Sequence, residues 1–396
     1  MKQIKILFIA MSNSIHTARW IKQIIDQKWQ LYLFPSISTN DIHTDILDYN
    51  IKVFTPFLSK SRKNIILKIL VRIIKKINNL YLNILKKKQS DIYIENLYKY
   101  LQKIKPDIIH TLETQYAGYL LYSVKEKYFY KKDFPKWWHT VWGSDIYLFG
   151  KMKGHKTRIQ NVLSSCDFFS SDCIRDNKLA QDFGFNKEIM PLFNLGFQLD
   201  YLQKIKINNA KTSKRKIIFV KGYEGWTGRA LVALYALKII KDYLINFDIL
   251  IHSYSDDSVK ISAELLENEA NINIKFIPLC TSHSDILRIH GASRIHIGLN
   301  ISDGIPSSVL EAMAMGAFPI QSWTSAADEW IKDGESGFLV PPEDPNKVAD
   351  AILRALTYDI LVDNAAEINW KTVEKRLNFN DLQKKVINSY QKILIT

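Results

Sequence analysis

Apolar and polar residues follow one another along this chain in short blocks that predict strands and helices in turn. Runs rich in Ile, Leu, Val, Phe and Trp stand at residues 4–10, 31–35, 51–54, 107–111, 136–140 and 167–170. These runs lack the alternation of a half-exposed strand, so they predict strands buried on both faces. After the capping candidates Asn13 and Ser14, apolar residues recur at helical spacing, as at Ile15, Ala18 and Ile21. Strands alternating with helices predict a parallel, doubly wound sheet.

The same pattern restarts after a polar and basic stretch at residues 200–216. Further strand-like runs stand at residues 216–222, 247–253, 272–278, 294–300 and 318–322, with helical patterns at 228–244 and 345–359. We therefore expect a first domain over residues 1–205, a second over 206–375, and an amphipathic helix over 376–396 that packs back on the first domain. Two doubly wound domains would face a central cleft, where the carboxyl ends of their strands bind ligands.

Length and cysteine usage narrow the class of protein. The 396 residues are too many for one ordinary domain, and 47% of them are hydrophobic. The three cysteines form no CxxC pair, which favours a reducing compartment. No signal-peptide pattern stands at the N-terminus, and no run reaches the roughly 18 apolar residues of a membrane span. These features predict a cytoplasmic protein.

The net charge of +14 is concentrated in one segment, residues 60–88. This segment holds ten Lys and Arg residues and no Asp or Glu, which leaves +4 for the rest of the chain. As a helix, this segment would carry its cations on one face and apolar residues on the rest, a pattern typical of helices that bind anionic membrane surfaces. The alternative is a solvated helix packed on its own domain. Nucleic acid is not an expected partner, because aromatic interleaving and a binding motif are absent.

The segment 302–320, "SDGIPSSVLEAMAMGAFPI", predicts a strand end, a turn and a helix. Gly304 permits a tight turn, and Pro306 suits a helix start. Ser307 and Ser308 add hydroxyls at that start, which attracts anions. Glu311, one turn later, presents a carboxylate that suits ribose hydroxyls. An ordinary strand, turn and capped helix would explain the same pattern.

This segment and the later "DGESGFLVPPEDPNKVADAI" at residues 333–352 resemble the signature of retaining glycosyltransferases of family four, which have the GT-B fold. The resemblance covers residues 216–358 best. It implies a nucleotide-sugar donor and no metal or other cofactor. It also implies that Glu311 holds the donor ribose and that Asp303, where the family usually has Glu, faces the sugar. The donor site would include Gly304, Ile305, Pro306, Ser307 and Ser308.

A diphosphate needs positive charge, and "VKGYEGWTGRAL" supplies Lys221 with Gly222 at a strand end and Arg229 at a helix start. In the family, an Arg at the strand end and a Lys at the helix start clamp the diphosphate. We interpret Lys221 and Arg229 as the same clamp with its members exchanged. The alternative is two surface cations that flank a flexible loop.

The first domain offers weaker candidates. Family members often carry a catalytic His near the reacting sugar, and His139 in "HTVWGSD" stands in a matching place, with Asp145 as its orienting group, a sugar ligand or a helix cap. The family's Gly-rich loop after the first strand is replaced by "SNSIHTAR", whose Ser12, Asn13 and His16 are candidate acceptor ligands. No metal-ligand spacing is present in the sequence.

The resemblance implies transfer with retention at the anomeric carbon. If residues 60–88 bind a membrane, a lipid-linked acceptor in envelope polysaccharide or lipopolysaccharide assembly is a further hypothesis; otherwise the acceptor is a saccharide. A membrane-bound acceptor would place the enzyme at the inner face of the membrane. Two alternatives stay open: a nucleotide-sugar epimerase of the same fold, which would need added acid and base carboxylates, and a non-catalytic membrane-associated scaffold.

Overall fold

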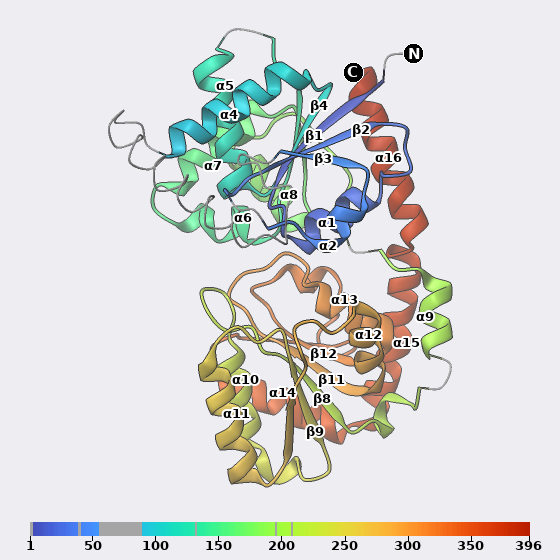
Figure 1. Cartoon of the computed structure of the whole chain (residues 1–396). Helices are drawn as coiled ribbons and strands as arrows, with labels where there is room; N and C mark the ends of the chain where they lie inside the picture. The colour runs from blue at the N-terminus through green and yellow to red at the C-terminus, as the bar shows by residue number, and fades with distance from the viewer. Residues whose placement is uncertain (1–2, 39–40, 55–88, 131–132, 195, 207–208) are drawn as a thin grey trace, which may run out of the picture. The chain divides into compact units, whose positions relative to one another are not determined.

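The structure is a computed structural model that describes residues 3–38, 41–54, 89–130, 133–194, 196–206 and 209–396 (Figure 1). The basic segment expected at residues 60–88 lies outside the described residues. The chain divides into two compact units. Unit 1 comprises Met1–Ser171, Asn177–Pro191 and Lys385–Thr396, and unit 2 comprises Asp172–Asp176 and Leu192–Lys384. The boundary expected after residue 205 differs from this division, in which the long segment of unit 2 begins at Leu192.

Unit 1 is built on a parallel sheet with seven strands among the described residues, in the order β3-β2-β1-β4-β5-β6-β7. The strands are β1 (Lys5–Ala10), β2 (Gln30–Pro35), β3 (Ile51–Val53), β4 (Ile108–Leu112), β5 (Lys136–Thr140), β6 (Phe168–Ser170) and β7 (Glu188–Ile189). The helices between them are α1 (Ile15–Lys22), α2 (Thr44–Asp48), α4 (Gln89–Ile104), α5 (Tyr119–Tyr128), α6 (Ser144–Tyr147), α7 (His155–Ser165) and α8 (Ile174–Asp182). The reversal of strand order at β1 and β4 confirms the doubly wound prediction for this half.

Buried aromatic residues join the C-terminal segment to the centre of unit 1. Tyr390 lies in the part of α16 (Phe379–Ile395) that belongs to unit 1, and its side chain is fully buried. Its hydroxyl accepts a hydrogen bond from Nε1 of Trp20 at 3.0 Å and lies 2.6 Å from Nδ1 of His110. His110 in turn stacks on Trp138 of β5. The last helix therefore completes one face of the unit 1 sheet.

Unit 2 is built on a second parallel sheet, with six strands in the described chain and the order β10-β9-β8-β11-β12-β13. The strands are β8 (Ile217–Lys221), β9 (Asp248–His252), β10 (Asn273–Phe276), β11 (Ser293–Gly298), β12 (Phe318–Ser322) and β13 (Phe338–Val340). The other helices are α9 (Leu199–Lys206), α10 (Ala230–Ile239), α11 (Asp257–Ala270), α12 (His283–Ala292), α13 (Ser307–Met315), α14 (Pro345–Thr357) and α15 (Asp359–Arg376). The strand order again reverses in the middle of the sheet, between β8 and β11.

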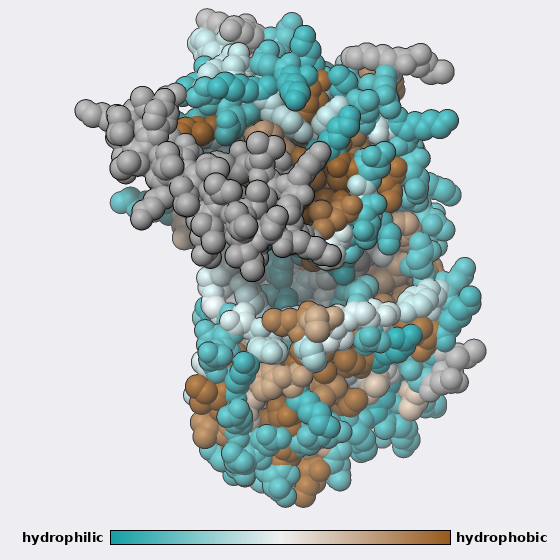
Figure 2. Space-filling view, in the orientation of Figure 1, coloured by the Kyte–Doolittle hydropathy of each residue, from teal (hydrophilic) through white to brown (hydrophobic). Residues whose placement is uncertain are grey.

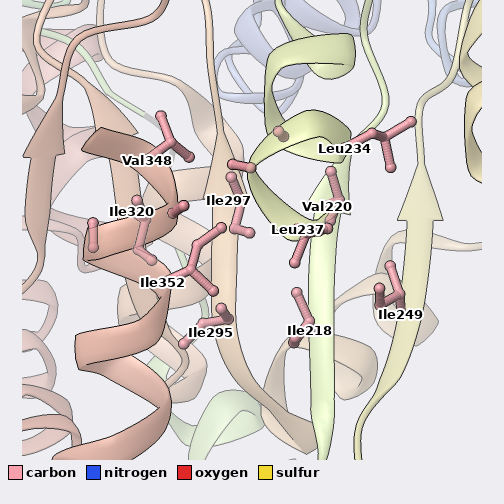
Figure 3. Packing of buried hydrophobic residues seen from close by; sticks show 14 of the residues in the cluster. Ile218, Val220, Leu234, Leu237, Ile249, Ile295, Ile297, Ile320, Val348 and Ile352 are labelled. Atoms are coloured by element: carbon pink, nitrogen blue, oxygen red, sulfur yellow. The ribbon is translucent and has the colours of Figure 1, made fainter. Parts of the chain in front are cut away.

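The core of unit 2 explains why its strands are apolar on both faces. On one face, Ile218 and Val220 of β8 pack with Leu234 and Leu237 of α10 (Figure 3). Ile295 and Ile297 of β11, Ile320 of β12 and Ile352 of α14 extend the same cluster. A second cluster contains α12 and α13 residues with parts of α9 and α15. Helices thus cover both faces, which removes the strands from water as expected for a parallel sheet.

The surface carries apolar side chains among polar ones, as Figure 2 shows for one view of the molecule. Exposed large apolar residues include Tyr235 and Ile239 of α10 and Ile261 and Leu265 of α11. Within the described ranges, none of the helices combines the length and the apolar character needed to span a membrane.

Candidate functional site

The loop after β8 leaves the sheet through a glycine that has no room for a side chain. The N–H of Gly222 donates to the carbonyl oxygen of His252 at 2.7 Å. A Cβ on Gly222 would lie 2.6 Å from Cγ2 of Ile251, well inside van der Waals contact. Only glycine therefore lets the loop cross this closely to β9, and this crossing places Lys221 at the carboxyl edge of the sheet.

The two cations of the predicted clamp have different partners. Nζ of Lys221 lies 3.9 Å from Oδ2 of Asp303. Arg229, which directly precedes α10, lies 3.3 Å from the carboxylate of Glu343 and donates to the carbonyl oxygen of Gly228 at 2.7 Å. The structure therefore brings Lys221 to the Asp303 turn and brings Arg229 to the segment that follows β13.

The turn after β11 is ordered by the side chain of Asp303. Its Oδ1 accepts from the N–H of Gly304 at 2.9 Å, and its Oδ2 accepts from Nδ2 of Asn300 at 3.2 Å. Pro306 is the N-cap residue of α13, and it provides no side-chain cap for this helix. Oγ of Ser308 is buried and has no hydrogen-bond partner among the described residues. A helix start without a side-chain cap, beside a buried hydroxyl, suits an anionic ligand.

Glu311 is a buried carboxylate held between two histidines. Its Oε1 accepts from Nε2 of His283 at 2.8 Å, and its Oε2 lies 3.7 Å from Nε2 of His290. Burial raises the pKa of Glu311, but the hydrogen bond from His283 and the nearby ring of His290 outweigh burial and lower the pKa below its ordinary value. The carboxylate is therefore ionised, as recognition of ribose hydroxyls requires. Both histidines come from α12, and the sequence analysis named neither of them.

Beneath this carboxylate lies a cluster of buried histidines on the unit 2 sheet. The rings of His290 and His296 are 4.9 Å apart between centroids, and those of His252 and His296 are 5.8 Å apart. Burial, aided by the nearby His290 and Lys221, lowers the pKa of His252 to about 3. Burial likewise lowers the pKa of His296, so the rings of His252 and His296 are neutral and do not add to the positive charge of Lys221 at the sheet edge.

The segment Asp172–Asp176 contributes groups that sequence reasoning did not name. Burial, followed by the charge of Asp176, raises the pKa of Asp172 to about 8. Asp172, Cys173 and Asp176 each offer one ligand atom within 4.8 Å of the others, which is a possible arrangement for a metal. Nε of Arg175 already donates to Oδ1 of Asp176 at 2.8 Å, however. This adjacent cation disfavours metal binding.

His139 lies inside β5 and not in the loop after it. Its side chain is buried, with Nδ1 2.8 Å from Oγ1 of Thr111 and Nε2 3.0 Å from Oγ1 of Thr114. Burial lowers its pKa to about 3, so the ring is neutral. Its catalytic role stays a prediction, while its contacts give it a structural role in the core of unit 1.

Asp145 joins the loops after β4 and β5. Its Oδ1 accepts from the N–H of Thr114 at 2.8 Å, and its Oδ2 accepts from the N–H of Trp142 at 2.6 Å. Glu113 stands beside it with a φ of 80°, and its carboxylate accepts from the N–H groups of Tyr116 and Ala117. Burial and the charge of Asp145 raise the pKa of Glu113 to about 8. A left-handed Glu has no local sequence signature, so Glu113 was not predicted.

The other candidates of unit 1 follow β1, whose neighbour in the sheet is β4. Ser12 is buried, and its hydroxyl donates to the carbonyl oxygen of Asp41 at 2.7 Å. Asn13 and His16 are exposed, and the ring of His16 lies 5.8 Å from that of Trp142. Because β1, β4 and β5 are parallel neighbours, these residues share one sheet edge with Asp145.

Comparison with known proteins shows which families the chain is similar to. Residues 201–371 match the family model of glycosyl transferases group 1, and residues 82–172 match that of the glycosyl transferase 4-like proteins. Both models describe glycosyl transferases, and each match covers less than half of the chain. An uncharacterized glycosyltransferase of Methanocaldococcus jannaschii is 24% identical over 222 residues, which cover 55% of this chain and 55% of that protein. The chain thus spans about half the length of this curated relative.

Several solved structures resemble this chain over nearly its full length. Sucrose-phosphate synthase from Thermosynechococcus elongatus has a TM-score of 0.71 at 14% identity and covers 99% of this chain and 100% of its own. Anabaena HepE in complex with UDP-glucose has a TM-score of 0.68 at 11% identity, with coverage of 98% and 100%.

A trehalose-6-phosphate synthase, studied for glycosyl transfer with retention, has a TM-score of 0.68 at 13% identity, with coverage of 98% and 99%. At such identities the likeness shows the fold alone. The chain has the GT-B fold, which confirms the fold expected from its sequence.

Proposed function

We propose that this chain transfers a sugar from a nucleotide-sugar donor to a saccharide or lipid-linked acceptor, with retention at the anomeric carbon. The observation that carries the proposal is the constellation at the carboxyl edge of the unit 2 sheet. The start of α13 lacks a side-chain cap, Glu311 is ionised one turn later, and Lys221 lies beside Asp303. The family matches and the UDP-glucose bound by a protein of the same fold support this class of donor.

The donor diphosphate is placed at the start of α13. The helix end carries about half a positive charge, and the buried hydroxyl of Ser308 has an open hydrogen-bonding capacity. Lys221 and Arg229 supply the remaining positive charge. The ion pair between Arg229 and Glu343 is weak, because the Glu343 side chain is largely exposed to solvent. Arg229 can therefore leave Glu343 and bind a phosphate at little cost in free energy. These groups stabilise the leaving diphosphate without a metal ion.

Glu311 is placed against the donor ribose. An ionised carboxylate has about four acceptor positions. His283 occupies one of them and His290 faces another, which leaves positions for two ribose hydroxyls. Asp303, with Gly304, Ile305 and Pro306, then faces the sugar, because the turn directly precedes the phosphate-binding helix start.

The acceptor is placed in unit 1, at the sheet edge that carries Ser12, Asn13, His16 and Asp145. We place the reaction in envelope polysaccharide or lipopolysaccharide assembly, at the cytoplasmic face of the membrane, with residues 60–88 binding anionic lipid. Flotation with anionic vesicles tests this step. Binding that is lost when the cations of residues 60–88 become Gln supports it, and equal binding by both proteins contradicts it.

A thermal-shift screen against UDP, GDP, ADP and CMP sugars tests the donor site, because a ligand of the folded state raises its apparent stability. Glu311→Ala should weaken binding of the stabilising donor by about 10- to 100-fold, as expected for one or two charge-assisted hydrogen bonds. Glu335→Ala, at an exposed carboxylate of unit 2, is the matched control. Equal affinity of the two variants contradicts the ribose role. Sugar interconversion would indicate an epimerase, and binding without turnover would indicate a scaffold.

A further inference from the structure

The segment Asp172–Asp176 follows a strand of unit 1 but packs in unit 2, against the turn that carries Asp303. Oδ2 of Asp172 accepts from the N–H of Ile305 at 3.0 Å. Nη2 of Arg175 donates to the carbonyl oxygen of Asp303 at 2.7 Å. The segment therefore bonds the backbone of this turn on both sides of Gly304.

Gly304 is shaped to receive the carboxyl group of Asp172. A Cβ on Gly304 would lie 2.3 Å from Oδ2 and 2.4 Å from Oδ1 of Asp172. Both distances are shorter than any real contact of a Cβ atom, and both lead to a carboxyl group that is itself bonded to the turn. Gly304 is thus required for space, because its neighbour Asp172 occupies the place of a side chain.

Arg175 is held in place by several further bonds. Its Nη1 donates to the carbonyl oxygen of Thr324 at 3.3 Å, and its Nε donates to Asp176 at 2.8 Å. The backbone N–H groups of Ile174 and Arg175 each donate to the carboxylate of Glu329 at 2.9 Å. A guanidinium anchored in this way presents Nη2 to Asp303 with little freedom to move.

Asp172 acts here as a neutral carboxylic acid. Burial and the charge of Asp176 raise its pKa to about 8, the N–H of Ile305 lowers it, and the charge of Asp303 raises it further. The other groups that face it are Arg175, which lowers its pKa, and the thiol of Cys173. Its Oδ1 is buried without a hydrogen-bond partner among the described residues. Ionisation would therefore add a negative charge beside Asp303, at the edge proposed to receive a diphosphate.

We propose that Asp172 and Arg175 are positioning residues of the donor site, which hold the turn from Asp303 to Pro306 so that it presents Asp303 and the α13 start to the donor. This inference rests on the proposed function, since the donor is a nucleotide-sugar. It assigns part of the donor site to a chain segment that lies more than a hundred residues before the motif.

Amide hydrogen exchange at Ile305 and donor affinity together test the proposal, with Asp172→Ala, Asp172→Asn and the exposed control Asp328→Ala. Asp172→Ala should speed exchange at Ile305 and weaken binding of the UDP, GDP, ADP or CMP sugar found in the screen by about tenfold. Asp172→Asn resembles the neutral acid, so it should retain affinity within about threefold. It should also abolish a loss of affinity that the native protein shows above about pH 8, where Asp172 ionises.

Exchange at Ile305 needs no nucleotide, so it separates this inference from the proposed function. Faster exchange in Asp172→Ala without binding of any donor would contradict the function but support the contact. Native exchange and native affinity in Asp172→Ala would overturn the positioning role. If Asp172→Ala fails to fold, the pH profile of Asp172→Asn tests the positioning role instead. A loss of donor affinity above pH 8 equal to that of the native protein would overturn this role.

Discussion

Replacement of His139 by Asn separates a structural role for this buried imidazole from a catalytic one. The Asn side chain can still bond Oγ1 of Thr111, but it is too short to reach Oγ1 of Thr114, which Nε2 of His139 contacts at 3.0 Å. The buried hydroxyl of Thr114 then lacks this partner. An unsatisfied buried hydroxyl costs about 1–3 kcal/mol, so we expect the free energy of unfolding at pH 7.5 to fall by about 2 kcal/mol.

The stability difference between the native protein and His139→Asn should also depend on pH, and the size of that dependence can be worked out. Burial lowers the pKa of His139 from 6.5 to about 3 in the folded state. Between these values the unfolded chain binds a proton that the folded chain does not, so the stability present above pH 6.5 is lost as the pH falls. From pH 7.5 to pH 5 this loss amounts to about 2 kcal/mol for one such group. Asn does not titrate, so the difference between the two proteins should shrink to nearly zero at pH 5.

Urea unfolding at the two pH values, followed by tryptophan fluorescence, measures this difference. Trp137 and Trp138 precede His139 in β5, so their signal reports on unit 1. A difference of the same size at pH 7.5 and pH 5 would refute the assignment of a neutral structural imidazole. If the His139→Asn variant instead keeps native stability and donor affinity but loses turnover by about a hundredfold or more, the catalytic role is restored.

Three further substitutions test other contacts. Gly304→Ala should weaken donor binding by at least about tenfold while unit 2 stays folded, because the new Cβ collides with Asp172; calorimetric titration measures the affinity, and an unchanged value would contradict the fit. Tyr390→Phe should lower the free energy of unfolding by about 2 kcal/mol, since it removes the hydroxyl that Trp20 and His110 share. Urea unfolding measures this change, and an unchanged stability would contradict the contribution of the hydroxyl. Arg294→Leu should lower the free energy of unfolding by about 2–4 kcal/mol, because it removes the hydrogen bonds to Ala355 and Asp359. The exposed control Arg288→Leu should lower it by less than about 0.5 kcal/mol. Thermal unfolding compares the two variants, and equal losses of stability would contradict the role of these hydrogen bonds.

Local chemistry made several elements predictable. The cap at Ser14 is confirmed, since its hydroxyl accepts from the N–H of His16 at 3.2 Å. The helix that begins near Ser307 ends at Gly316, which adopts a φ of 80° as a glycine C-cap should. The apolar runs became strands because parallel sheets are covered on both faces. Two short strands, β7 and β13, were not predicted.

The partners of His139 show where local patterns stop being sufficient. The sequence predicts a strand over residues 136–140, and β5 spans Lys136–Thr140, so the position of His139 near the strand end was predictable. Partners for a polar side chain inside a strand come from neighbouring segments, here Thr111 and Thr114. The pattern of one strand does not contain them, so a buried structural histidine and an exposed catalytic one look alike in sequence.

The sequence by itself determined the alternation of strands and helices, the two doubly wound halves and the turn–helix motif from Asp303 to Gly316, because these depend on neighbours within a few residues. Only the tertiary structure decided which distant groups complete that motif. His283 reaches Glu311, and Asp172 fills the space left open by Gly304, 132 positions away in the chain. The physical reason is that these contacts join segments far apart in the chain, which meet only when the fold packs them together and which no local interaction connects.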